Sequence, residues 1–244
     1  MVFYEPGVTD HGLPHDPFKA CVVPRPIGWI STLNTDGSAN LAPYSQFNNL
    51  TFDPPYVMFS ANQKPSDADK KDTVINAERE GEFCWSLATY HLREAVNITA
   101  EQVPYGEDEF KLAGLTKESG KIVKAPMIAE SPVKFECKYH TTFRLPGNPP
   151  MGSVDIVIGR VVGVHISDSV LTNGLLDIKK TVPIARCGYW QYAVIRETFE
   201  MVIPGDARIR AGLEGSAKLN GAMKTGEYVK EEGEKEPEAF EVHG

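Results

Sequence analysis

The sequence has few cations relative to its acidic residues. Its 244 residues include 25 Lys and Arg against 33 Asp and Glu, which gives a net charge of -8 and a pI near 5.3. Nucleic acids and anionic membrane surfaces attract proteins through concentrated positive charge. We therefore expect neither as a partner, and an anionic ligand would need local basic groups or backbone N–H donors.

Long hydrophobic runs and clustered cysteines are also missing. The most apolar stretch, residues 154–166, contains Asp155 and Arg160 and is too short to cross a bilayer. The N-terminus has no basic region followed by an apolar run, so we expect no secretory signal. The four cysteines lie far apart without a Cys-x-x-Cys pair. This spacing favours reduced thiols and a cytoplasmic location over a disulfide framework or a zinc site.

Several motifs that would identify an enzyme class do not occur. The chain has no Gly-x-Gly-x-x-Gly after a strand, no Walker A loop and no Gly-x-Ser-x-Gly elbow. A nucleotide cofactor would therefore be bound in some other way. His11 and His15 are four residues apart, but Pro14 between them excludes a regular helix that would present both to a metal. We expect no metal site.

Short β-branched and apolar runs separated by Pro and Gly dominate the chain, and no βαβ alternation occurs. This pattern favours a mainly β fold, a barrel with a few helices, over a doubly wound sheet. Helices are expected at residues 72–80 and 91–101, with Gly81 ending the first, and a helical turn at 106–114 should carry Phe110 and Leu112 inward. The expected strands are residues 28–34, 39–48, 56–61, 83–88, 133–144, 153–166 and 189–196.

The composition changes after Pro204, where small and charged residues take over and glutamate recurs from Lys230 to Glu241. We expect one domain at residues 1–204 and a charged C-terminal extension at residues 205–244 that is helical or disordered.

Three segments together carry the strongest functional signal: residues 24–32 (PRPIGWIST), 40–48 (NLAPYSQFN, followed by DPP at 53–55) and 70–76 (KKDTVIN). In this order and spacing the chain resembles the flavin reductase-like family of FMN-binding split-barrel proteins, from about Pro24 to Tyr192. Glu109-Phe110 and Glu130-Ser131-Pro132 also fit. The resemblance implies a Greek-key split β-barrel, a homodimer and an FMN site at the subunit interface. FMN in preference to FAD rests on this resemblance alone.

The middle segment suits a flat ring. Ala42 and Pro43 keep the backbone slim, Tyr44 could flank a ring, and backbone N–H and C=O groups next to Pro43 could hydrogen-bond the ring edge. Ser45 is a further candidate ligand in this segment. Taken alone, these residues are better explained by a proline-broken edge strand with Tyr44 in the core. Ser31 and Thr32, at a strand end, offer hydroxyls to the cofactor or only to a turn.

Lys71-Asp72-Thr73 opens the helix expected at residues 72–80. A helix N-terminus presents N–H groups and a partial positive charge to a phosphate, and Lys71 adds a full charge. Because Asp72 would repel a phosphate, we assign it as the N-cap and Thr73 as the phosphate ligand. A well-capped surface helix is the alternative.

Five further residues have open roles. Arg25 could face the phosphate or pair with a surface acid, while Ser60 and Asn48 could each bind the flavin or only a turn. His165 could position nicotinamide, although a structural role is favoured. Arg186 could contact a nicotinamide phosphate or the partner subunit, or it could be a surface charge exposed to solvent.

The resemblance favours an NAD(P)H:flavin oxidoreductase that accepts a hydride from NADH or NADPH onto flavin. Electrons would pass to free flavin, a partner monooxygenase or another acceptor protein. Such chemistry needs no protein nucleophile, so no catalytic side chain is expected. The alternative is a non-catalytic, flavoredoxin-like carrier that takes electrons from a protein donor. A third hypothesis is a dimeric scaffold that has lost flavin.

Overall fold

A computed structural model describes residues 1–64, 69–201, 204 and 215 of the chain. Its internal contacts divide the chain into a first unit, Met1–Glu197, and a second, Thr198–Gly244. All of the expected C-terminal extension except Gly215 lies outside the described residues, and the domain boundary at residue 204 remains a prediction. The helices and strands of the described residues all lie in the first unit.

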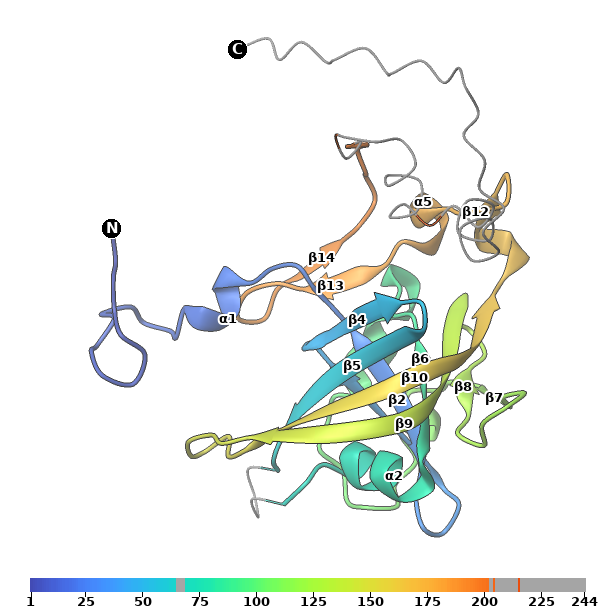
Figure 1. The fold of residues 1–244 in the computed structure, drawn as a ribbon, viewed down its shortest axis with the longest axis horizontal. Coiled ribbons are helices and arrows are strands. Elements are labelled where there is room, and N and C mark those ends of the chain that lie inside the picture. Colours follow the sequence, from blue (N-terminus) through green and yellow to red (C-terminus); the bar gives the residue numbers. More distant parts are fainter. Residues whose placement is uncertain (65–68, 202–203, 205–214, 216–244) are drawn as a thin grey trace, which may run out of the picture. The chain divides into compact units, whose positions relative to one another are not determined.

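Seven antiparallel strands form the main sheet of this unit (Figure 1). Their order across the sheet is β3-β2-β6-β9-β10-β5-β4, so β6 lies between strands from distant parts of the sequence. The order is that of a Greek-key arrangement and not of a simple meander. The strands span Gly28–Leu33 (β2), Ala39–Tyr44 (β3), Phe47–Phe52 (β4), Pro55–Asn62 (β5), Glu82–Ser86 (β6), Val133–Leu145 (β9) and Val154–Ile166 (β10).

The sheet closes on itself because its two outer strands are consecutive in the chain. Only Ser45 and Gln46 separate β3 from β4, although these strands lie at opposite ends of the strand order. β3 also contacts β5, which pairs with β4 at the other end of the strand order. The two edges must therefore meet at this corner, which makes the sheet a split barrel. The predicted mainly β barrel is confirmed.

The corner between β3 and β4 is also where the sequence prediction of strands was least accurate. One strand was expected at residues 39–48, whereas the structure has two that belong to opposite edges of the sheet. The helix predicted at residues 72–80 is α2, Asp72–Glu80, and ends at Gly81 in the left-handed conformation with φ 69°. The expected helix at 91–101 is a 3₁₀ turn, Tyr90–Leu92, followed by the short α3, Arg93–Ile98.

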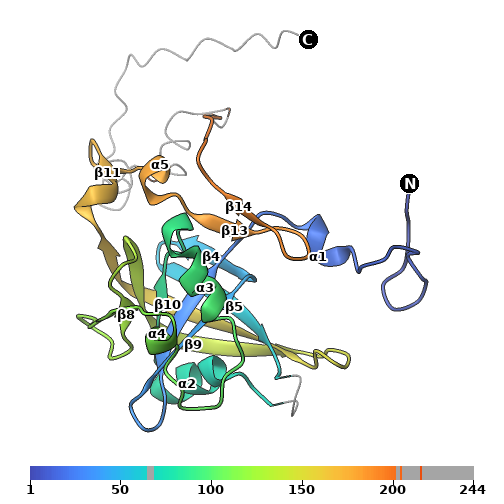
Figure 2. The same cartoon turned by 180° about the vertical axis from the view of Figure 1, so that it is seen from behind.

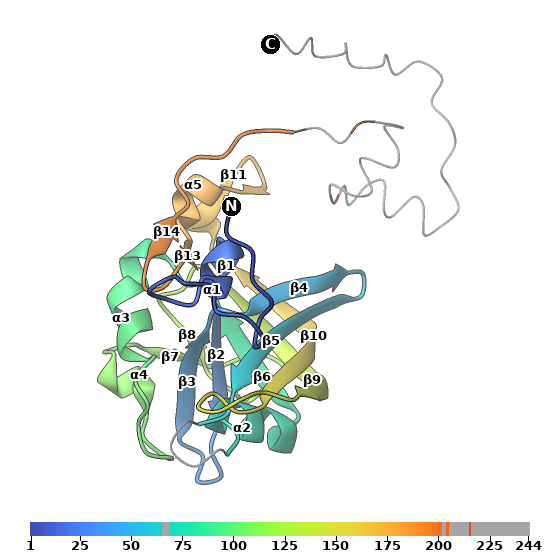
Figure 3. The same cartoon turned by 90° about the vertical axis from the view of Figure 1, so that its left-hand side faces the viewer.

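Two hydrophobic cores lie on opposite faces of β2. Ile30 belongs to the barrel interior, together with Phe59, Phe83 and Val157. Its neighbour Trp29 points the other way, into a second core that includes residues of α3 and the short helix α4, Glu109–Leu112. Figures 2 and 3 show α3 and α4 beside β3, with α2 at one end of the barrel. Because β2 is covered on both faces, its polar residues are buried as well.

Helix α4 corrects one burial prediction. Phe110 is 1% exposed, as expected of an inward residue, but Leu112 is 50% exposed. Two positions along a helix correspond to a rotation of about 200°, so both cannot face the same core.

The remaining elements are short. A second sheet contains β1 (Arg25–Pro26), β13 (Ile184–Arg186) and β14 (Tyr192–Val194), the last within the strand expected at residues 189–196. Two small pairs join β7 (Lys117–Glu118) to β8 (Met127–Ile128) and β11 (Leu171–Thr172) to β12 (Leu175–Leu176). The other helical pieces are α1 (Phe18–Cys21), η2 (Asp168–Val170) and α5 (Ile178–Thr181). In the described part of the chain, no helix has the length and apolar character needed to span a membrane.

Candidate functional site

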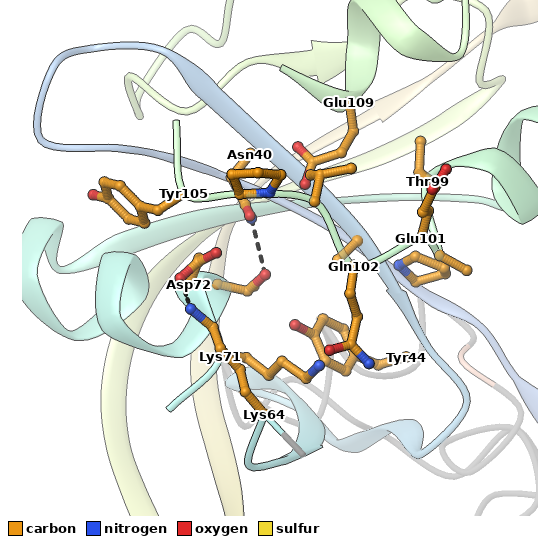
Figure 4. A pocket seen from close by; sticks show the side chains of 16 residues that line it. Asn40, Tyr44, Lys64, Lys71, Asp72, Thr99, Glu101, Gln102, Tyr105 and Glu109 are labelled. Carbon is orange, nitrogen blue, oxygen red and sulfur yellow. Dashed lines mark hydrogen bonds and ion pairs between the residues drawn. The ribbon is translucent and has the colours of Figure 1, made fainter. Parts of the chain in front are cut away.

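A cavity of about 500 Å³ lies where the end of β3, the start of α2 and the segment 99–105 converge (Figure 4). This volume is within the range of small-molecule sites. Five of the predicted cofactor residues line it: Ala42, Pro43, Tyr44, Lys71 and Thr73. The other lining residues are Asn40, Lys64, Asp72, Thr99, Ala100, Glu101, Gln102, Val103, Pro104, Tyr105 and Glu109.

One wall consists of the slim backbone of β3 and the ring of Tyr44. The Tyr44 ring packs against Phe59 of the barrel core with the ring centroids 5.0 Å apart. Burial raises the pKa of Tyr44, and a hydrogen bond with Thr73 opposes this rise. The phenol is therefore neutral at physiological pH and available for hydrogen bonding. This wall offers an apolar shelf with a polar edge.

The first residues of α2 form a second side of the cavity. Lys71, not Asp72, is the N-cap, which corrects the sequence assignment. Asp72 is instead neutralised by Lys64, whose Nζ lies 2.6 Å from Oδ1. Lys71 extends across the cavity toward Tyr44 (Figure 4). The helix N-terminus and Lys71 thus face the cavity while Asp72 is occupied by a partner, and this combination suits an anionic group.

The hydroxyl group of Thr73 belongs to a network of hydrogen bonds from buried amide side chains. Asn40 Nδ2 donates to Thr73 Oγ1 at 2.9 Å and to Thr32 Oγ1 at 3.1 Å. Thr32 also accepts Asn76 Nδ2 at 3.1 Å. Because the Thr73 oxygen accepts from Asn40, its own hydroxyl proton can point elsewhere, toward Tyr44 or the cavity. Thr32 therefore lies behind Asn40 and not in the cavity itself.

The segment 99–105 forms the third side and is tied to the barrel at both ends. Thr99 Oγ1 accepts Trp29 Nε1 at 2.9 Å and donates to the carbonyl of Val96 at 3.2 Å. At the other end, the Tyr105 hydroxyl accepts the N–H of Thr35 at 3.1 Å. The cavity wall is consequently held in place by hydrogen bonds to β2 and to the turn after it.

Glu109 closes the cavity from α4. It is 6% exposed, and its Oε2 accepts the N–H of Leu41 at 2.9 Å. Burial raises the pKa of this carboxyl group, and the nearby Asp72 and Asp108 raise it further, against the lowering effect of the backbone N–H groups. Figure 4 shows the carboxyl group directed into the ring of cavity side chains.

Six predicted ligands do not line this cavity, and their role as cofactor ligands remains a prediction. Ser31 and Thr32 are buried in the sheet, where the Ser31 hydroxyl donates to the carbonyl of Pro126 at 2.5 Å. Ser45 lies at the β3–β4 corner, 3.4 Å from the Gln46 side chain. The Asn48 side chain accepts the N–H of Asn49 at 3.0 Å. The other two are Arg25, which donates to the carbonyl of Val22 at 2.9 Å, and Ser60 on β5.

His165 and Arg186 also lie elsewhere in the first unit. The ring of His165 binds Glu136, with Nε2 and Oε1 2.7 Å apart. Arg186 donates to the carbonyl of Tyr189 at 2.6 Å and lies over the ring of Tyr192. Neither residue lines the cavity.

Sequence reasoning missed Asn40, Lys64, Glu109 and the whole segment 99–105 as cavity residues. Asn40 and Glu109-Phe110 were noticed only as part of the resemblance. An acidic residue directly before an inward-facing Phe110 was a usable signal for a buried carboxylate. No spacing rule could have brought Lys64 or residues 99–105 to the start of α2. Among the described residues, no group of three or more His, Cys, Asp and Glu side chains could hold a metal ion.

Comparison with known proteins agrees with this architecture. An uncharacterised protein of Halalkalibacterium halodurans is 34% identical over 183 residues, which cover 75% of this chain and 87% of that protein. Component B of nitrilotriacetate monooxygenase from Bacillus cereus superimposes with a TM-score of 0.75 at 29% identity, over 82% of this chain and 98% of that one.

Two more distant structures share the fold. A split-barrel protein of Shewanella frigidimarina has a TM-score of 0.66 at 23% identity, over 76% of this chain and 89% of its own. An FMN-binding protein of Thermus thermophilus has a TM-score of 0.62 at 17% identity, over 82% of this chain and all of its own. Residues 20–185 match the flavin reductase like domain, so the chain belongs to the flavin reductase-like family.

Proposed function

We propose that the chain binds FMN in the cavity between β3 and α2 and acts as an NAD(P)H-dependent flavin oxidoreductase. The observation that carries this proposal is the convergence of Ala42-Pro43-Tyr44 with Lys71 and Thr73 on one cavity. Family membership and the FMN-binding protein of similar fold support the choice of FMN.

The donor and acceptor set of the cavity fits the cofactor. Lys71, the Thr73 hydroxyl and the first N–H groups of α2 would hold the phosphate. Ala42, Pro43 and Tyr44 would support the flat ring, and the buried Asn40 would keep the Thr73 hydroxyl in place. When bound, the flavin supplies the hydride-accepting ring. The chain itself contributes position and the exclusion of water by the segment 99–105.

Family membership supports a proposal for the reductant and the acceptor. We infer that NADH or NADPH supplies the hydride and that electrons continue to free flavin or to a partner protein. Similarity to a monooxygenase component favours a monooxygenase as that partner, by analogy. We also expect a homodimer, which size-exclusion chromatography with light scattering would detect.

The first test is an anaerobic absorbance titration of the full chain with FMN, followed by NADH or NADPH. The proposal predicts that a bound-flavin spectrum forms and that at least one nucleotide bleaches it. If flavin binds but neither nucleotide bleaches it, the protein is an electron carrier that needs a protein donor. If no flavin binds, the scaffold hypothesis replaces both.

The phosphate position is tested by combining Lys71→Ala with Thr73→Ala. We expect the double variant to raise the Kd for FMN by at least about thirtyfold, since it removes a charged and a neutral hydrogen-bond donor. Riboflavin, which has no phosphate, should bind almost unchanged. Lys70→Ala is the matched control, because Lys70 pairs with Glu78 at 2.6 Å and does not line the cavity. Unchanged FMN affinity in a folded double variant would contradict this placement.

A further inference from the structure

The cavity contains one buried carboxylate that the proposed phosphate site does not use. Glu109 is 6% exposed, and the contacts that stabilise its charge are the backbone N–H groups of Leu41 and of Glu109 itself. Among the described residues, no Lys, Arg or His forms an ion pair with it. A buried carboxylate has room for about four hydrogen bonds, so this one retains acceptor capacity that points into the cavity.

The charges around Glu109 determine what the cavity can bind there. Asp72 and Asp108 lie near enough to repel its charge, while Glu101 lies at the cavity rim. The two lysines of the cavity come from the start of α2 and the segment before it, on the opposite side from α4 (Figure 4). An anionic group is therefore favoured near Lys71 and disfavoured near Glu109, where a neutral O–H or N–H donor is needed.

A flavin has such donors at a distance from its phosphate, in the ribityl hydroxyls and the imide N–H of the ring. We propose that Glu109 accepts a hydrogen bond from one of these neutral donors, and that it thereby orients the flavin with its phosphate toward Lys71. This inference rests on the proposed function and adds a ligand-positioning residue to it. Glu109 lies outside the three sequence segments that carry the family resemblance, although Glu109-Phe110 also fits it.

The test compares FMN with riboflavin in three full-length proteins: the unmodified chain, Glu109→Gln and Glu101→Gln. Gln at position 109 can still accept the Leu41 N–H, but its amide then directs a donor into the cavity in place of an acceptor. Glu101→Gln is the matched control because it removes the same charge from an exposed residue of the same cavity. Dissociation constants are measured by fluorescence quenching, and each variant is checked for folding by its melting temperature.

We expect Glu109→Gln to raise the Kd for FMN and for riboflavin by the same factor, about tenfold, since one charged hydrogen bond is lost in both complexes. Glu101→Gln should change either constant less than about twofold. Two results would overturn the inference. One is unchanged binding of both ligands to Glu109→Gln. The other is tighter binding of FMN alone, which would place the phosphate, not a neutral donor, beside Glu109.

The same measurements separate this inference from the proposed function. If the unmodified chain binds neither flavin, the proposed function fails. If it binds FMN and the Lys71→Ala/Thr73→Ala variant does not, while Glu109→Gln binds normally, the function stands and only the role of Glu109 is wrong.

A second measurement applies if Glu109→Gln does not fold. Riboflavin binding to the unmodified chain is followed from neutral pH down to 4.5, the ordinary glutamate pKa above which that of Glu109 is raised, and free riboflavin does not change its charge over this range. The other ionisable groups that line the cavity are Tyr44, Lys64, Lys71, Asp72, Glu101 and Tyr105, and Asp108 lies behind Glu109. Protonation of Glu109 should weaken binding several-fold as the pH falls, equally in the unmodified chain and in Glu101→Gln. A flat profile, or one abolished by Glu101→Gln, would overturn the inference.

Discussion

Two buried glutamates, Glu109 and Glu136, have opposite acid–base behaviour although both are almost completely withdrawn from solvent. Glu136 on β9 accepts the backbone N–H groups of Lys121, Ile122 and Val123, at 3.0, 2.6 and 2.7 Å, and also binds His165. Burial alone would raise its pKa, but these four partners together lower it to about 2. Glu109 has only backbone N–H partners at Leu41 and at its own residue, and its pKa is raised.

The difference shows that donors, not burial, decide what a buried carboxylate does. Glu136 organises a loop: a side-chain carbon at Gly120 would lie 2.6 Å from its Oε2, and one at Gly163 would lie 3.0 Å from its Oε1. Because neither glycine has a side chain, both positions leave room for the Glu136 carboxylate. Glu109 has a similar degree of burial but faces a cavity. A carboxylate with many donors stabilises the fold, whereas one with fewer donors beside a cavity can still accept a hydrogen bond from a ligand.

The largest effect is expected from Glu136→Gln. The Gln amide turns an N–H group toward backbone donors and removes the charged acceptor that the His165 ring contacts. We expect the free energy of unfolding, measured in urea, to fall by about 3–5 kcal/mol. Glu94→Gln is the control, because Glu94 pairs with Arg93 at the surface, where their side chains are 77% and 44% exposed, and its loss should be below about 1 kcal/mol. Equal effects of the two substitutions would contradict the role given to Glu136.

His165→Phe should have a smaller effect. The substitution keeps a ring on β10 but removes one of the four partners of Glu136 and leaves the three N–H groups in place. We expect a loss of about 1–2 kcal/mol in the free energy of unfolding. Flavin reduction by NADH should keep its KM if His165 is structural. A raised KM without a loss of stability would restore the alternative that His165 positions nicotinamide.

These two glutamates also show what could be predicted from the sequence. Strand alternation and turn residues predicted most of the barrel, and a capped apolar pattern predicted α2 with its bounds. The split of residues 39–48 into β3 and β4 was missed, because barrel closure is set by long-range pairing, not by local preference. The same limit applies to the site. Pro43, Tyr44, Lys71 and Thr73 lie in quoted segments, but Glu109 needed the packing of α4 on β3 to reach the cavity.

The smallest effect, and the one that separates the two glutamates most directly, is the pH dependence of stability. Because the pKa of Glu136 is lowered to about 2 in the folded chain, its contribution is present above pH 4.5 and is lost as the pH falls toward 2. The pKa of Glu109 is raised, so the folded state binds a proton more readily there than the unfolded state does. Glu109 should therefore make the chain more stable as the pH falls from neutral toward 4.5.

Urea unfolding of the unmodified chain and of Glu109→Gln, at pH 7 and at pH 5, tests the predicted direction of this change in stability. At pH 7 the variant should be as stable as the unmodified chain or more stable by up to about 1 kcal/mol, because it no longer buries a poorly compensated charge. At pH 5 this advantage should shrink or reverse. Glu136→Gln should show little such change over the same interval, since Glu136 is still mostly ionised at pH 5 in both the folded and the unfolded state. If the two variants followed the same pH trend, the number of hydrogen-bond donors would not explain why one glutamate stabilises the fold and the other faces the cavity.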